Sequence, residues 1–187
     1  EQKPDKRSKE LKTLQEIYNF YSKSRSSKKR FENLASTVAE HLIRKSATTY
    51  KAGWITKGSG DSGIDFIGRM DIGSGFGSAK VIVLGQAKCE SLNSPTGGTH
   101  IARTVAKLKR GWLGVYVTTS YFSPPVQVEI LEDKYPILLI NGKMLSQEVN
   151  EIILEQGYRN VKEYLKDIDL RYEGEIKFRD PEEILLD

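Results

Sequence analysis

The sequence predicts an α/β fold, with a central mixed β-sheet flanked by helices. Stretches with apolar residues at helical spacing alternate along the chain with short runs rich in β-branched and aromatic residues. Two of these runs, 112–119 and 135–140, are almost continuously apolar, which is typical of strands covered on both faces. At 187 residues the chain can bury one core of this kind.

The first two elements are predicted helices. Apolar residues recur at helical spacing in residues 8–22, and a second stripe runs through residues 28–45. The basic run Lys28-Lys29-Arg30 opens the second helix, either as a solvated face or as a phosphate contact. His41, near its end, is expected to be a surface or hydrogen-bonded residue and not a ligand.

The next two elements are predicted strands, which form a hairpin that turns at residues 73–78 and carries the chemistry. Asp65 lies on its first strand, and Gln86 and Lys88 lie on its second. Gln86 and Lys88 are two residues apart, so their side chains point to the same face. The hairpin can therefore bring Asp65, Gln86 and Lys88 to one edge. Oxygen ligands for a divalent metal beside a fixed ammonium group are what phosphodiester hydrolysis requires.

The turn before this hairpin matches a nucleotide-binding pattern in form only. Residues 58–63 read Gly-Ser-Gly-Asp-Ser-Gly, but a dinucleotide motif must follow a strand and open a helix. Here Ile-Asp-Phe-Ile follows, which is β-like, so the sequence argues against a nucleotide fold. The glycines are expected to turn the backbone sharply and bring Asp61 close to Asp65.

The second half of the chain continues the alternation. A short helix is predicted over residues 101–110, and its cations are candidates to contact a DNA backbone: Arg103, Lys107, Lys109 and Arg110. The strand at 112–119, a helix over 123–132, the strand at 135–140 and a helix over 144–154 follow. Beyond Gly157 we expect a helix at 158–165, a short strand within 168–178 and a final turn from 179.

Composition sets limits on location and partners. The net charge is +4, but residues 1–30 hold ten Lys or Arg against four Asp or Glu, whereas residues 151–187 hold six against eleven. The excess of positive charge in residues 1–30 is compatible with a polyanionic partner. The single cysteine, Cys89, excludes an internal disulfide and a cysteine-cluster zinc site, which suits a cytoplasmic protein. No signal peptide or apolar membrane span is apparent, so no membrane partner is expected.

Several ordered motifs together resemble a known family. They are Phe-Glu-Asn-Leu from Phe31, Gly-Asp-Ser-Gly-Ile-Asp ending at Asp65, Gln-Ala-Lys at 86–88, and Gly-Val-Tyr-Val-Thr-Thr-Ser-Tyr-Phe-Ser from Gly114. The chain resembles the catalytic domain of Mrr-like restriction endonucleases, a branch of the PD-(D/E)XK superfamily, as found in MspJI-like modification-dependent enzymes. The resemblance spans roughly 110 residues, about the length of one domain. It implies a restriction-endonuclease-like core.

The resemblance also implies roles for individual residues. Asp65, Gln86 and the Ala87 carbonyl would bind Mg²⁺ or Mn²⁺, Lys88 would orient the attacking water, and Glu32 would assist. Glutamine occupies the middle position in the Mrr-like branch, where most of the superfamily has a carboxylate. A neutral amide is a weaker ligand for a hard cation than a carboxylate, so Glu32 or a substrate phosphate is expected to complete the shell.

The expected protein is therefore a restriction-type deoxyribonuclease, the cleavage domain of an enzyme that acts on modified (methylated) DNA in the cytoplasm of a bacterium or archaeon. Its domains are expected to be an N-terminal helix and linker (1–27), the nuclease domain (28–156) and an acidic extension packing on the core (157–187). Because the chain begins without methionine, we expect a missing N-terminal recognition domain, and a homo-oligomer is expected for double-strand cleavage. The alternative is a catalytically silent DNA-binding or oligomerisation domain of a larger defence protein.

Overall fold

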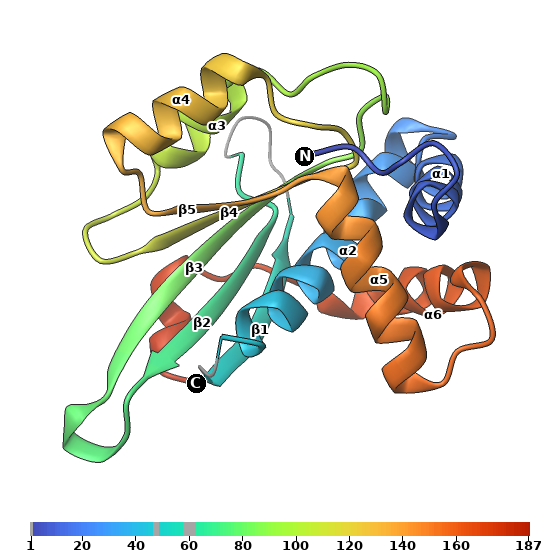
Figure 1. Cartoon of the computed structure of the whole chain (residues 1–187). Coiled ribbons are helices and arrows are strands. Elements are labelled where there is room, and N and C mark those ends of the chain that lie inside the picture. Colours follow the sequence, from blue (N-terminus) through green and yellow to red (C-terminus); the bar gives the residue numbers. More distant parts are fainter. Residues whose placement is uncertain (1, 47–48, 58–62) are drawn as a thin grey trace.

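The computed structural model describes residues 2–46, 49–57 and 63–187, in which six strands form a mixed sheet flanked by helices (Figure 1). The strand order is β5-β4-β3-β2-β1-β6. Neighbours β1, β2 and β3 are antiparallel, whereas β3-β4, β4-β5 and β1-β6 are parallel. The predicted α/β class with a mixed sheet is confirmed.

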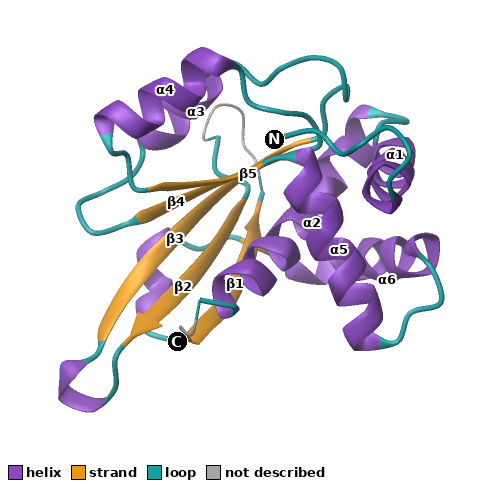
Figure 2. Ribbon diagram, viewed as in Figure 1, coloured by secondary structure: helices purple, strands orange, loops and turns teal. Residues whose placement is uncertain are grey.

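The elements alternate in the expected way along most of the chain (Figure 2). The strands are β1 (Thr49–Thr56), β2 (Phe66–Ile72), β3 (Ala79–Lys88), β4 (Leu113–Thr118), β5 (Ile137–Ile140) and β6 (Ile176–Lys177). The α-helices are α1 (Lys9–Tyr21), α2 (Arg25–Arg44), α3 (Gly98–Val105), α4 (Pro124–Asp133), α5 (Gly142–Gln156) and α6 (Val161–Glu175), and two short 3₁₀ helices are η1 (Gly75–Gly77) and η2 (Pro181–Leu185).

Alternation along the strands divides the core between two faces. Val115 and Val117 of β4 join the large core under α1, α2, α5 and α6, whereas Tyr116 between them packs with α3 and α4. On β3, Ile82 and Leu84 form a third cluster with Ile184 of η2. Side chains two apart share a face, so Gln86 and Lys88 continue the row of Ile82 and Leu84, on the face away from α2.

Helix starts follow their capping residues. Helix α2 begins at Arg25, three residues before its predicted start, because the Ser24 side chain caps it by accepting from the Ser27 amide. Ser8, Asn141 and Asn160 cap α1, α5 and α6 in the same way.

Helix α3 begins earlier and ends earlier than the sequence predicts. It ends at Val105, so the prediction of a helix through Arg110 was wrong. The chain leaves the helix there because Leu108 and Trp112 turn in to pack against the third cluster, and Gly111 takes a left-handed conformation (φ +81°). Lys107, Lys109 and Arg110 consequently lie on a connection and not on a helix.

The two strands at the far edge were the least predictable. Strand β1 was not among the predicted elements, and it pairs along its length with β2 and carries a bulge between Ala52 and Trp54. The predicted strand within 168–178 shrinks to Ile176–Lys177 because α6 extends to Glu175. Residues 168–178 alternate apolar and polar, but Ile168 and Tyr172 are four apart and both buried, so the same residues also suit a helix.

Candidate active site

Asp65 lies at the head of β2 and is tied to the next strand. Its Oδ2 accepts a hydrogen bond from the Ala87 amide at 2.7 Å, and its own amide donates to the Gly85 carbonyl at 2.8 Å. Ala87 lies between Gln86 and Lys88, so this carboxylate is fixed beside the predicted pair. The structure thereby brings Asp65, Gln86 and Lys88 together at one end of the sheet, the edge at which β2 begins and β3 ends.

The close approach of these strands depends on Gly85. An ideal Cβ at this position would lie 2.0 Å from Cζ of Phe66, the residue paired with Gly85 across the two strands. Only a residue without a side chain lets the buried Phe66 ring lie across the backbone here. The residues on either side of this contact, Asp65 and Gln86, are held close to each other as a result.

Glu32 approaches Asp65 from α2. It is 8% exposed, and its Oε2 lies 3.4 Å from the Tyr172 hydroxyl. Burial, and after it the negative charge of Asp65, raise the pKa of Glu32 to about 8. Burial also raises the pKa of Asp65 to about 6, against the lowering effects of the Ala87 amide and of nearby lysines. Two carboxyl groups are thus held near each other in a site that disfavours their charge.

Lys88 has two polar neighbours in the described part of the chain. Its Nζ lies 2.7 Å from Nε2 and 3.1 Å from Nδ1 of His100, in the first turn of α3, and 3.6 Å from Oε1 of Glu90. Burial and the positive charge of Lys88 lower the pKa of His100. A neutral imidazole can accept from the ammonium. The other oxygen of Glu90 is held by the Thr96 hydroxyl at 2.6 Å.

Gln86 also contacts α3. Its side-chain amide is hydrogen-bonded to the hydroxyl of Thr104, which is 2% exposed and lies one turn after His100. The other end of the amide faces Gly63, because an ideal Cβ there would lie 3.7 Å from the Gln86 nitrogen. His100, Thr104 and Glu90 had no role in the sequence prediction. The only signal was the four-residue spacing of His100 and Thr104, which carries meaning once α3 is known to cross this end of β3.

A cleft of about 770 Å³ opens at this edge, with Asp65, Ala87, Lys88 and Glu90 in its lining. Its remaining wall includes the start of α2, namely Arg25, Lys28 and Lys29. The positive charges of Lys29, Lys107 and Lys88 lower the pKa of Asp65, so these side chains are close enough to act on it. Lys28 and Lys29 of the basic run therefore border the cleft, whereas Arg30 pairs with Asp169 and Glu173 of α6.

The four cationic side chains that were predicted to contact DNA lie in different environments. Lys107 lies near the cleft, since its Nζ is 3.1 Å from an ideal Cβ on Gly63. Lys109 is paired with Glu182 of η2, and its ammonium lies 5.1 Å from the centre of the Trp112 ring. Arg103 and Arg110 are exposed. Asp61, expected beside Asp65, falls outside the described residues.

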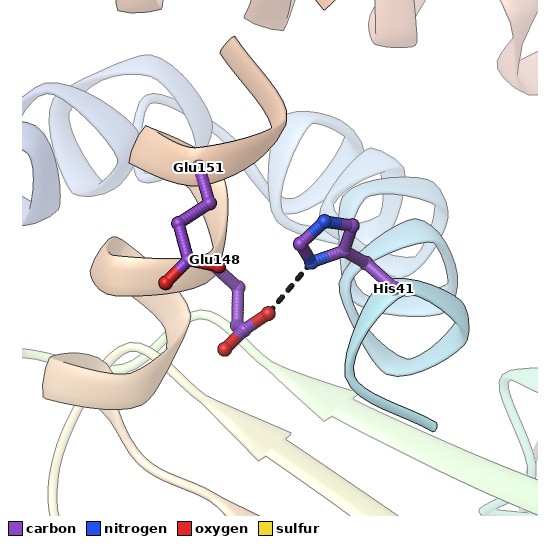
Figure 3. Close-up of side chains that lie close together, drawn as sticks. All are labelled: His41, Glu148 and Glu151. Atoms are coloured by element: carbon purple, nitrogen blue, oxygen red, sulfur yellow. Dashed lines mark hydrogen bonds and ion pairs between the residues drawn. The ribbon is translucent and has the colours of Figure 1, made fainter. Parts of the chain in front are cut away.

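A second group of potential metal ligands lies elsewhere. Nδ1 of His41 on α2 is 2.6 Å from Glu148 on α5, and one ligand atom each from His41, Glu148 and Glu151 lie within 4.8 Å of one another (Figure 3). Lys45 directs its ammonium to both glutamates, so a cation of the protein already neutralises them. His41 is nine residues beyond Glu32, about 13 Å along the helix. This group ties α2 to α5, away from the cleft.

Comparison with known proteins agrees with this geometry. Residues 24–149 match the family model Mrr_cat, described as restriction endonuclease. The solved structure of MspJI restriction endonuclease in complex with a 27-mer oligonucleotide matches the whole chain, with a TM-score of 0.92 and 44% identity, over 41% of that protein. The DNA modification-dependent restriction endonuclease AspBHI shares the fold, with a TM-score of 0.70 and 23% identity, over 90% of this chain and 41% of its own.

A search of the curated proteins found no match. In the described residues no helix is both long and apolar enough to cross a bilayer. The chain spans less than half the length of the two solved relatives, and the family model covers most of it, including Glu32 and the Asp65, Gln86 and Lys88 edge. The chain belongs to the Mrr_cat restriction endonuclease family.

Proposed function

We propose that this chain is a nuclease domain that hydrolyses DNA phosphodiester bonds with the help of a divalent cation, Mg²⁺ or Mn²⁺. The observation that carries the proposal is the bond from the Ala87 amide to Asp65, which places a carboxylate beside Gln86 and Lys88 at the cleft. Family membership supports the reaction class.

The residues at this edge fit a hard divalent cation. Asp65 and Glu32 offer carboxylate oxygens, and Gln86 and the Ala87 carbonyl offer neutral ones, a donor set typical of Mg²⁺ and Mn²⁺. The charge of Asp65 raises the pKa of Glu32, so the two groups repel when both are ionised. A bound cation would relieve that repulsion, activate water and neutralise charge on the phosphate.

Lys88 supplies the fixed positive charge. Its side chain is 32% exposed in the cleft and is held by His100 and Glu90. An ammonium group in this position can orient the attacking water and stabilise the negative charge that develops on the phosphate oxygens. Cations at the start of α2 and along residues 103–110 would hold the neighbouring phosphates.

Double-stranded DNA is the proposed substrate, and selection of a modified site is assigned to another part of the protein. MspJI has been solved with an oligonucleotide, and AspBHI is described as modification-dependent. The chain spans 41% of each of them, so a recognition domain outside this chain can supply the choice of base. Cutting both strands needs two such sites, which we propose are supplied by association of copies.

The test is cleavage of supercoiled plasmid, modified and unmodified, with Mg²⁺ or Mn²⁺. Wild type should nick the plasmid, and Asp65→Ala and Lys88→Ala should each slow nicking by about 10²–10³-fold or more. Both variants should keep their far-UV circular dichroism, and Lys12→Ala, at an exposed position of α1, should cleave like wild type. Cleavage retained by Lys88→Ala would remove the lysine from the mechanism.

A silent DNA-binding or oligomerisation domain predicts a different pattern. In that case the chain would bind DNA with a steep salt dependence, or associate, and show no nicking with either metal. Joining the chain to the proposed recognition domain would then not restore cleavage. Restored cleavage would instead mean that the nuclease domain needs that recognition domain, and it would leave the proposed chemistry in place.

A further inference from the structure

Helix α3 crosses the end of β3, and two side chains of the helix contact two side chains of the strand. His100 and Thr104, one helical turn apart, are on the same face of α3, whereas Gln86 and Lys88, two residues apart, are on the same face of β3. Each helix residue contacts one strand residue: Thr104 contacts Gln86, and His100 contacts Lys88. The helix thus touches both members of the pair from the side opposite to α2.

The contact with Gln86 bears on a problem peculiar to a glutamine ligand. A carboxylate presents oxygen at both ends, but an amide presents oxygen at one end and an NH₂ group, which repels a cation, at the other. The two ends have the same shape, so the hydrogen-bonding partners decide which end faces the cleft. A glutamine at this position serves a cation only if something selects its orientation.

Thr104 can make this selection. In the structure its hydroxyl donates to the Gln86 amide oxygen and the amide nitrogen faces Gly63, while the His100 carbonyl at 3.2 Å is a second acceptor for the same proton. When the proton goes to the His100 carbonyl, the hydroxyl oxygen is free to accept, and it then prefers the NH₂ end of Gln86. The amide oxygen is then turned to the opposite end, which faces Gly63 in the wall that also holds Asp65.

The contact between His100 and Lys88 also restricts the orientation of a side chain. The His100 ring can accept from the ammonium, and Glu90, itself held by Thr96, lies on the same ammonium. Two partners restrict a side chain that otherwise has four rotatable bonds, so less of its rotamer freedom remains to be lost when the ammonium acts.

We propose that α3 is the positioning element of the nuclease site. On metal binding the Gln86 amide turns over, Thr104 donates to the His100 carbonyl and holds the Gln86 NH₂ end, so that the Gln86 carbonyl faces the metal, while His100 fixes the Lys88 ammonium. Neither residue touches the reacting atoms. The inference rests on the proposed function, because it concerns how that site is aligned. It also accounts for a glutamine ligand in a site where a carboxylate would need no such partner.

The first test measures metal binding without DNA, by isothermal titration calorimetry or Mn²⁺ electron paramagnetic resonance. Thr104→Val keeps the shape and removes the hydroxyl, and it should weaken Mn²⁺ binding by about 10-fold or more. Thr104→Ser, which keeps the hydroxyl, should bind like wild type. Unchanged Mn²⁺ affinity in a folded Thr104→Val protein would overturn the role of Thr104.

A double-mutant cycle separates the effect of the Gln86 amide orientation from a general loss of packing. In Gln86→Glu both ends of the side chain are oxygen, so orientation no longer matters. Adding Thr104→Val to Gln86→Glu should therefore change Mn²⁺ affinity much less than it does in the wild-type background. An equal loss in both backgrounds would show that the threonine acts through packing, which contradicts the proposal.

The role of His100 is tested by single-turnover cleavage. His100→Leu should slow the cleavage step about 10-fold while leaving Mn²⁺ affinity and DNA affinity unchanged, and His100→Gln, which keeps an acceptor, should recover most of the rate. Equal rates in all three proteins would overturn this half of the proposal. Wild-type cleavage that Asp65→Ala abolishes would meanwhile uphold the proposed function, so the two ideas can fail separately.

Discussion

Two carboxyl groups, Glu32 and Asp65, are kept by the fold in surroundings that disfavour their charge. The pKa of Glu32 rises from an ordinary 4.5 to about 8, first because of burial and then because of Asp65. A carboxyl whose pKa is higher in the folded than in the unfolded state contributes stability below its unfolded pKa, and that contribution disappears as pH rises through its folded pKa. Metal-free protein should therefore lose stability between about pH 4.5 and pH 8 through this group.

Glu32→Gln should remove that loss. In the presence of EDTA at pH 9 the variant should unfold at a higher temperature than wild type, whereas at pH 4 the two should differ little. Each pKa unit corresponds to about 1.4 kcal/mol, so the gain is on the order of a few kcal/mol. Thermal unfolding followed by circular dichroism measures it, with Glu16→Gln at an exposed position of α1 as control. A gain independent of pH would contradict this account.

At the residue scale, part of the candidate site could be read from the sequence. Asp65, Gln86 and Lys88 could be grouped because strand alternation and a hairpin are local properties. His100 and Thr104 could not, because their contacts depend on where α3 crosses the sheet. The role assigned to each of these residues stays a proposal.

At the element scale, the start of α2 forms a basic wall of the cleft that holds Asp65. Arg25→Ala and Lys28→Ala should each weaken duplex binding and reduce the salt slope by about 1, because each cation would neutralise one phosphate. Lys109→Ala should have a smaller effect, since Glu182 already pairs with that lysine. Fluorescence anisotropy of a labelled duplex across a salt series distinguishes them. A larger loss for Lys109→Ala would favour the connection after α3 as the main DNA contact.

Glycines in two elements should respond to alanine in opposite directions. Gly174, exposed in α6, has open space around it, so Gly174→Ala should stabilise the fold by about 0.5–1 kcal/mol. Gly85→Ala would place a methyl group 2.0 Å from the Phe66 ring and should destabilise by about 1–3 kcal/mol or more. Urea unfolding of the two variants gives both values. A neutral Gly85→Ala would mean that Phe66 moves aside easily.

Elements with strong helical spacing or continuous apolar runs were predictable, and those decided by distant contacts were not. The helices at 8–22 and 28–45 were located to within a few residues. Residues 168–178 fit both a strand and a helix, and packing of Ile168 and Tyr172 in the large core decides for α6. The end of α3 depends on where Leu108 and Trp112 find apolar partners.

At the scale of the whole molecule, η2 closes the face of the sheet opposite to α2. Ile184 is fully buried against Trp54, Ile67 and Ile82, and its carbonyl accepts from the buried Arg69. The last residues of the chain are thereby joined to β1, β2 and β3 without lining the cleft.

Ile184→Ala should reduce the free energy of unfolding by about 2–4 kcal/mol, because it leaves a cavity in that cluster. Leu186→Ala, where the side chain is 85% exposed, should change it by less than about 0.5 kcal/mol. DNA affinity measured well below the unfolding temperature should be the same for both. A loss of DNA affinity in Ile184→Ala alone would link η2 to the cleft.

The chain has one thiol, and it adjoins the proposed catalytic lysine. Cys89 is 7% exposed and lies in the lining of the cleft, and burial raises its pKa to about 11, so it reacts slowly with thiol reagents. Its labelling rate reports access to the end of β3 without any engineered probe. A ligand that covers this end of the cleft would slow the labelling in proportion to its occupancy, so the labelling rate of Cys89 measures that occupancy.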